Sequence, residues 1–228
     1  MRYVVTGRVH PERANVSISP CSWTHPDGGE VVVRCESSQL TVTLDDPRID
    51  GHVSAFVTAE HVAQAVVSAL GFSLATGYSV ELIQVLEESG AVHVFGVRTP
   101  ELMFEPHGPV FAAAAELSKR DLFFRMALAD YARAFRDSLA CAAYCYRAIE
   151  AIKSAFGPGD DSRLWPKMHD ALGTDRENID RAVKPFADPV RHGNWSELPP
   201  THSAQRAEML RITRDVLARY LSFRRPSA

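Results

Sequence analysis

The sequence lacks the features that identify several common classes of protein. No stretch approaches the roughly 18 consecutive apolar residues of a membrane-spanning helix, and residues 1–8 alternate as in a strand, without the apolar block of a secretion signal. The patterns GxGxxG, GxxxxGK[ST], HExxH and GxSxG are all absent. We therefore expect a cytoplasmic protein without membrane contact, outside the nucleotide-fold, metalloprotease and hydrolase classes.

Cysteine is scarce, with four in 228 residues. Cys21 and Cys35 enclose His25, but this spacing matches no CxxC pair and no second pair completes a set of four zinc ligands. Cys141 and Cys145 lie one helical turn apart, where small apolar cysteine packs well. No tight cluster is expected among the histidines of the first half: His10, His25, His52, His61, His93 and His107. The sequence therefore predicts free or buried thiols in a reducing compartment, no metal and no cofactor.

Charge divides the chain in two. Residues 1–110 carry 6 Lys and Arg against 13 Asp and Glu, a net charge of −7, whereas residues 111–228 carry 19 against 15, a net charge of +4. Such an asymmetry indicates two modules with different surfaces. Pro and Gly cluster between residues 99 and 109, so we place an acidic module at 1–106 and a second module at 107–228.

The first module reads as an α+β unit with an antiparallel sheet. Short runs rich in Val and Thr predict five strands: Val4–Val9, Glu30–Glu36, Gln39–Leu44, Tyr78–Leu86 and Ala91–Val97. Thr58 is a typical helix cap, and the stripe behind it predicts a helix that buries Val62, Ala65, Val66, Ala69 and Leu70.

The second module reads as a helical bundle of four or five helices. Apolar residues recur every three or four positions from Leu128 to Ile149, and Asp137-Ser138 divides that stretch into two helices. Capping boxes are expected at Ser118 and Thr174, and the final helix is predicted at 203–223. Aromatic side chains exceed what one small bundle buries, which predicts a homodimer; they are Phe123, Phe124, Tyr131, Phe135, Tyr144, Tyr146 and Trp165.

One segment, residues 188–195 (Asp-Pro-Val-Arg-His-Gly-Asn-Trp), gathers groups that carry chemistry. The imidazole of His192 titrates near neutral pH, and the planar fork of Arg191 suits a phosphate. The competing interpretation is a polar cap in which Gly193 and Asn194 end a helix in the left-handed conformation. Both interpretations stay open on residue chemistry alone.

This segment, together with residues 144–152 (Tyr-Cys-Tyr-Arg-Ala-Ile-Glu-Ala-Ile), resembles the HEPN superfamily of small helical bundles. Members carry a Tyr-Arg-Ala-Ile/Leu-Glu stretch on an early long helix and an Arg-polar-x-x-x-His motif near a closing helix pair. The resemblance covers residues 110–225. With its N-terminal module, the chain is also similar to MauJ-type methylamine-utilisation proteins.

Carried over residue by residue, His192 matches the motif histidine, Asn194 follows it as in the family, and Asp188 takes the polar place. The motif arginine should stand near Ala187 and is missing there. Arg191 is a poor replacement, because neighbours on a helix point about a hundred degrees apart.

Other charged residues of the second module complete the candidate site. Lys184 lies further from His192 along the chain than the spacing of the family motif allows. On the early helix, Glu150 is expected either to face His192 across the bundle or to pair with Arg147 one turn away.

The resemblance implies metal-independent RNA cleavage in catalytic members, with His192, Arg191, Asn194 and Glu150 as the candidate catalytic residues. It implies a binding or dimerisation module in inactive members, with Asp188, Arg147 and Lys184 as candidate binding residues. The missing arginine favours a non-catalytic homodimer, as in bacterial stress or defence systems, that binds RNA, a nucleotide or a protein partner.

Two alternatives remain open, a ribonuclease centred on His192 and a metabolic accessory protein. The arginines of the last helix favour an anionic partner, although a solvated helix face explains them equally well. The acidic module offers a surface for a protein partner.

Overall fold

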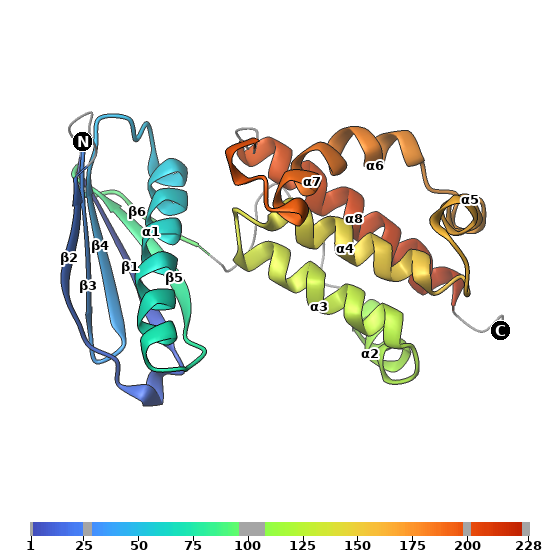
Figure 1. The fold of residues 1–228 in the computed structure, drawn as a ribbon, viewed down its shortest axis with the longest axis horizontal. Coiled ribbons are helices and arrows are strands. Elements are labelled where there is room, and N and C mark those ends of the chain that lie inside the picture. Colours follow the sequence, from blue (N-terminus) through green and yellow to red (C-terminus); the bar gives the residue numbers. More distant parts are fainter. Residues whose placement is uncertain (1, 25–28, 96–107, 198–201, 225–228) are drawn as a thin grey trace. The chain divides into compact units, whose positions relative to one another are not determined.

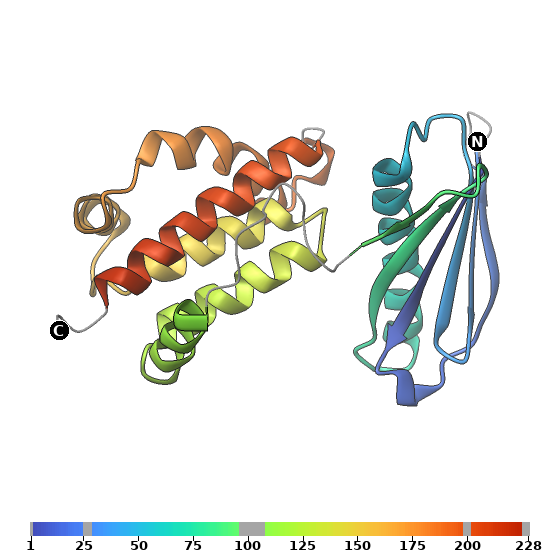
Figure 2. The same ribbon diagram turned by 180° about the vertical axis from the view of Figure 1, so that it is seen from behind.

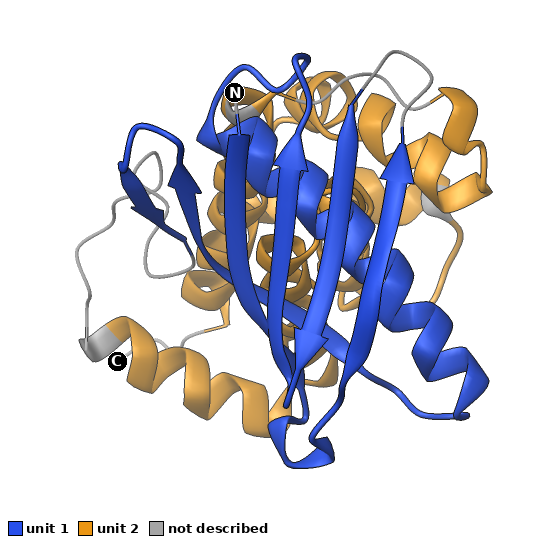
Figure 3. Cartoon of the chain, turned by 90° about the vertical axis from the view of Figure 1, so that its left-hand side faces the viewer, with its two compact units in different colours: residues 1–100 blue, residues 101–228 orange. Residues whose placement is uncertain are grey.

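The computed structural model describes residues 2–24, 29–95, 108–197 and 202–224. The chain forms two compact units, residues 1–100 and residues 101–228 (Figure 3). The predicted α+β class is confirmed, since an antiparallel sheet with one helix precedes a helical region. The boundary predicted at 106 and 107 falls in the stretch 96–107, which lies outside the described residues.

The first unit is a six-stranded antiparallel sheet in the order β2-β3-β4-β1-β5-β6, with the long helix α1 against it (Figures 1 and 2). Because β4 and β5 flank β1, the chain crosses over β1 through α1. The elements are β1 (Arg2–His10), β2 (Ile18–Thr24), β3 (Glu30–Glu36), β4 (Gln39–Asp45), α1 (His52–Ser73), β5 (Ser79–Glu87) and β6 (Val92–Val94), with a short 3-10 turn η1 (Glu12–Ala14).

Alternation along the strands gives the sheet one buried face. On β1, Tyr3, Val5 and Val9 are buried while Arg8 is exposed. Val42 on the neighbouring strand β4 and Val33 on β3 beyond it are fully buried as well. A period of two places these side chains on the face that α1 covers and leaves the opposite face open to solvent.

Helix α1 begins at His52 and is capped by Gly51, about two turns before the Thr58 cap that the sequence predicts, so that prediction is wrong. Of the predicted stripe, Val62, Val66 and Leu70 are partly buried against the core, whereas Ala65 and Ala69 are exposed. The fully buried residues of the helix are Ala55, Ala59, Ala63, Val67 and Gly71. Small side chains let a helix approach a sheet closely, and the larger ones pack beside them. By length and composition α1 would also span a membrane, with a mean hydropathy of 1.3. Here it is the core helix of an α+β unit.

The five predicted strands are confirmed, with ends that shift by one or two positions, except that β6 ends at Val94 and the end predicted at Val97 lies outside the described residues. One strand, β2, is missed by the sequence pattern, because Pro20 and several serines interrupt it. It lies at the edge of the described sheet and pairs with β3, where proline costs no ladder hydrogen bond.

The second unit is a helical bundle in which α4 packs against α3, α7 and α8 (Figures 1 and 2). Its elements are α2 (Gly108–Arg120), α3 (Leu122–Arg136), α4 (Cys141–Ser154), α5 (Asp161–Leu172), α6 (Arg176–Ala182), α7 (Lys184–His192), the 3-10 turn η3 (Trp195–Glu197) and α8 (Ser203–Phe223). The core is centred on buried residues of α4, among them Cys145, Ala148, Ile149 and Ile152.

The described part of this unit has seven α-helices, more than the four or five predicted. Two predicted caps are wrong by a few residues. Ser118 lies near the end of α2, and Asp121 caps α3 instead, accepting a hydrogen bond of 3.0 Å from the amide of Phe124. Likewise Asp175, not Thr174, caps α6. The break between α3 and α4 at Asp137 and the bounds of α8 are confirmed.

Candidate functional site

The segment singled out from the sequence forms the C-terminal end of α7. The helix ends at His192, and Gly193 takes the left-handed conformation with φ of 75°. The amide of Asn194 donates to the carbonyl of Pro189 at 2.8 Å, which closes the turn. The interpretation of this segment as a helix cap is therefore confirmed.

Arg191 is held in place by three neighbours. Its guanidinium carbon lies 4.7 Å from the centre of the Tyr146 ring. One guanidinium nitrogen lies 3.2 Å from Oδ1 of Asp188, and the other lies 3.3 Å from the carboxylate of Glu150 on α4. The guanidinium group of Arg191 thus makes one cation–π contact and two ion pairs, and each ion pair uses a different terminal nitrogen. We call Tyr146, Glu150, Asp188 and Arg191 the Arg191 cluster.

Tyr146 belongs to the cluster and is buried, so the expectation that it is one of the aromatic residues left over for a dimer surface is wrong. Burial is the main cause that raises the pKa of the phenol to about 12, and the nearby carboxylate of Glu150 adds to it. The ring therefore stays neutral at physiological pH and offers its face to Arg191. The signal for this residue is its i,i+4 spacing to Glu150 on a predicted helix.

Glu150 on α4 pairs with Arg191 of α7, the residue before His192, and not with Arg147 one turn away as one interpretation expected. Arg147 instead lies 3.4 Å from Oδ1 of the buried Asp130, which also pairs with Arg133 at 2.8 Å. The carboxylate of Asp130 is almost fully buried and so attracts cations more strongly than exposed carboxylates do.

The remaining candidate residues do not join the cluster. His192 and Asn194 are exposed, and within the described part of the chain the side chain of His192 has no hydrogen bond or ion pair. Lys184 is the first residue of α7, one turn before Asp188. Of the seven predicted site residues, the structure thus brings together Glu150, Asp188 and Arg191.

Ala187 stands where the motif arginine is expected, and it is fully buried in the bundle core. A guanidinium at this position would be removed from water into an apolar core, which is costly. The packing of α7 therefore favours alanine over arginine at position 187.

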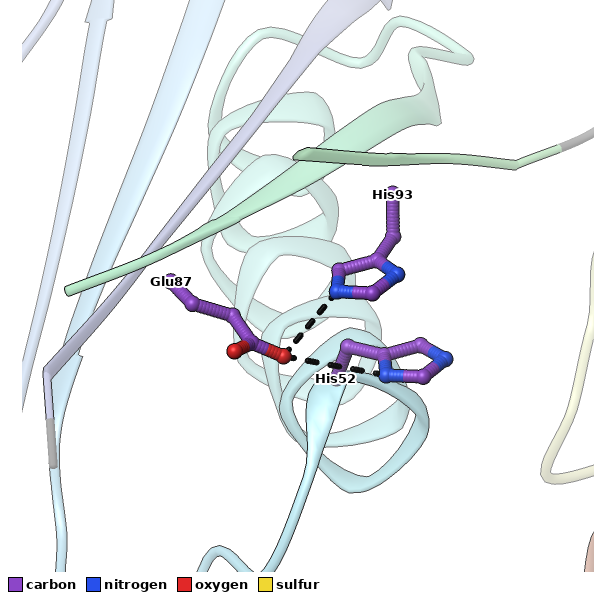
Figure 4. A group of neighbouring side chains, drawn as sticks. All are labelled: His52, Glu87 and His93. Carbon is purple, nitrogen blue, oxygen red and sulfur yellow. Dashed lines mark hydrogen bonds and ion pairs between the residues drawn. The ribbon is translucent and has the colours of Figure 1, made fainter. Parts of the chain in front are cut away.

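The first unit contains a second group of interest, which the sequence analysis missed. His52, Glu87 and His93 have donor atoms that all lie within 4.8 Å of one another (Figure 4). The prediction that the first-half histidines form no tight cluster is wrong for these two. Among the described residues, no other group of three such side chains meets this criterion. Cys35 is buried and donates its thiol to the carbonyl of Val16, while the predicted neighbour His25 lies outside the described residues.

Fold and sites together define a two-unit protein, an α+β unit followed by a helical unit. Two family descriptions match these units in the same order. The Domain of unknown function (DUF8168) N-terminal domain matches residues 3–95, and the Domain of unknown function (DUF8168) C-terminal domain matches residues 111–225. The chain belongs to the DUF8168 family. No curated protein and no solved structure matches it, and neither description refers to HEPN or methylamine-utilisation proteins.

Proposed function

We propose that this protein is a non-catalytic, HEPN-like binding protein whose helical unit forms a homodimer. The observation that carries the proposal is that Arg191, the residue before His192 in the sequence, is paired with Glu150 and Asp188. In support of the resemblance, the two segments on which it rests lie against each other, since α4 packs on α7.

The cluster is unsuited to a phosphate. Arg191 contributes one positive charge and its two carboxylate partners contribute two negative charges, so an incoming phosphate meets a net negative group. To stabilise a transition-state phosphate, Arg191 would have to leave both carboxylates, which then repel the phosphate. His192 alone supplies only a proton donor or acceptor.

Three arginines on or just after α8 make contacts within the bundle, whereas Arg211 is exposed. Arg206 donates to the carbonyls of Ala134 and Phe135 at the end of α3. Arg219 pairs with Asp215, and Arg224 pairs with the buried Asp121. Because these cations stabilise the bundle itself, they support an anionic partner less than the sequence suggests. RNA binding therefore ranks behind protein binding.

Exposed apolar side chains support a protein partner. Leu122, Phe123 and Met126 lie in the first turns of α3 with 55%, 41% and 43% of their surface exposed. Large apolar residues that gather on a surface indicate an interaction site. A second copy of the chain is the occupant we propose, because HEPN-like bundles pair with themselves.

The test is an RNA-cleavage assay with EDTA present throughout, comparing wild type with His192→Ala and Arg191→Ala. We expect equal and negligible cleavage of single-stranded RNA by all three. Arg211→Ala, an exposed arginine of α8, serves as the matched control for loss of positive charge. Cleavage by wild type and by Arg211→Ala that disappears in His192→Ala would overturn the proposal and establish the ribonuclease alternative.

A further inference from the structure

We propose that His52, Glu87 and His93 form an open binding site for one divalent transition-metal ion, with Zn²⁺ the preferred ion. Two imidazoles and one carboxylate are a ligand set that zinc accepts, and three protein ligands leave a fourth position for water or a substrate. The proposal concerns the first unit alone and does not depend on the function proposed for the helical unit.

The backbone brings the three residues together. His93 on β6 is paired with Val85 on β5, and Val85 is fully buried on the face that α1 covers. Paired residues in an antiparallel sheet point to the same face, as do residues two apart on one strand. His93 and Glu87 therefore both point to the α1 side of the sheet, where His52 is the first residue of α1.

The distances suit a small ion. Nε2 of His93 lies 3.0 Å and Nδ1 of His52 lies 3.8 Å from the same Oε1 atom of Glu87 (Figure 4). In a tetrahedral zinc site with bonds of about 2.0–2.1 Å, neighbouring ligand atoms are about 3.4 Å apart. These two distances fall on either side of this value, and the ligand atoms of the two histidines lie within 4.8 Å of each other.

One rearrangement is needed. The two imidazole rings are stacked, with centroids 3.7 Å apart and an angle of 4° between their planes. Nitrogen lone pairs lie in the ring plane, so two parallel rings do not aim at a common ion. Rotation of one ring about its Cβ–Cγ bond opens the stack. The side chains of His52 and His93 are 40% and 31% exposed, which leaves room for that rotation.

The surroundings orient the ligands. The hydroxyl of Ser89 donates to Oε2 of Glu87 at 3.2 Å, so Oε1 is the oxygen left for the histidines. On the other side, Phe95 lies 6.1 Å from the His52 ring and stacks on Phe56 at 4.2 Å. A hydrogen-bonded carboxylate beside an apolar wall is typical of the groups that surround a bound metal.

The experiment measures Zn²⁺ binding to the full chain after treatment with EDTA and dialysis, by competition with a chromophoric chelator. We expect wild type to bind one Zn²⁺ per chain. His52→Ala, His93→Ala and Glu87→Gln should each weaken binding at least about tenfold. His61→Ala, an exposed histidine of the same helix, should bind as wild type does. Cys21→Ser tests whether the ion is held by thiols instead.

Thermal unfolding gives a second readout and shows that each variant folds. Added Zn²⁺ should raise the Tm of wild type and of His61→Ala, because a ligand that binds the folded state stabilises it. The three site variants should fold and show no such shift. The proposal is overturned if wild type binds no Zn²⁺, if the site variants bind it as tightly as wild type, or if Cys21→Ser abolishes binding.

Discussion

The hydroxyl of Tyr220 on α8 donates a 2.7 Å hydrogen bond to Oδ2 of Asp121, the residue that caps α3. Both side chains are buried, and the other carboxylate oxygen of Asp121 accepts from the amide of Phe124. Arg224 lies 3.4 Å from the same carboxylate. Burial and the adjacent carboxylate raise the pKa of Tyr220, so the phenol keeps its proton and remains a donor. The carboxylate of Asp121 thus connects the start of α3 to the last turn of α8.

Removal of this carboxylate should destabilise the helical unit strongly. Asp121→Ala removes the cap of α3 and leaves the buried hydroxyl of Tyr220 without an acceptor, so we expect a loss of about 2–4 kcal/mol. Tyr220→Phe leaves the cap in place and should cost about 1 kcal/mol. Urea unfolding followed by circular dichroism measures both. Asp215→Ala, which breaks an exposed pair with Arg219, is the control and should change little. An equal loss in all three variants would contradict the role given to Asp121.

His169 makes stability depend on pH. Burial, and then the nearby Arg176, lower the pKa of this histidine below its ordinary value of 6.5. Its Nδ1 lies 2.8 Å from the hydroxyl of Thr174, and its Nε2 is buried without a partner in the described part of the chain. The folded state therefore favours the neutral ring, whereas the unfolded chain takes up a proton more readily. The stability that this group contributes is present above pH 6.5 and is lost as the pH falls through the folded-state pKa.

His169→Gln should reduce this dependence, because glutamine keeps a polar group near Thr174 and does not titrate. We expect the Tm of wild type to fall between pH 7.5 and pH 5.5 and that of the variant to fall less. His192→Gln removes an exposed histidine and serves as the control. Identical pH profiles for wild type and His169→Gln would show that this ring does not control the effect.

Local patterns in the sequence predict much of the fold. Alternating valines predict the strands of the first unit, and periods of three and four predict α4 and α8. What they miss depends on contacts distant in sequence. Strand β2 has weak propensity and forms because β3 offers a partner, and α1 is placed by small residues that fit the sheet. A single sequence gives no measure of these close approaches.

The candidate sites show the same limit. The segment around Arg191 attracts attention because its charged residues are adjacent in the chain, whereas its partners Tyr146 and Glu150 come from another helix. His52 and His93 are separated by an entire helix and a strand, so only the crossover connection and the register of β6 bring them together. Spacing along the chain does not reveal a cluster built in this way.

Restoring the motif arginine should not create a nuclease. Ala187→Arg places a charge at a fully buried position, so we expect a loss of more than about 3 kcal/mol in unfolding free energy. RNA cleavage should stay negligible in the fraction that folds. Urea unfolding and the EDTA cleavage assay measure the two effects, with Ala132→Arg at an exposed position of α3 as the control. A stable Ala187→Arg protein that cleaves RNA would show that α7 can present an arginine to His192.

The apolar start of α3 should hold the proposed homodimer together. Leu122 and Met126 lie one turn apart on α3, and both are about half exposed. Since about half of each side chain is already buried, burying the rest against a second copy is worth about 0.7–1.5 kcal/mol per side chain, and a symmetric dimer buries four of them. The double variant Leu122→Glu, Met126→Glu should therefore raise the dimer dissociation constant at least about a hundredfold.

Light scattering over a range of micromolar concentrations measures the mass directly. We expect a dimer for wild type and a monomer for the double variant, with unchanged helical content by circular dichroism. Arg125→Gln changes an exposed polar residue in the same turns of α3 and should remain dimeric. Salt screens charged contacts but does not weaken apolar ones. Because the proposed interface is apolar, the wild-type dimer should persist at high ionic strength. A wild-type monomer at every concentration would reject the dimer, and a dimeric double variant would place the interface elsewhere on the bundle.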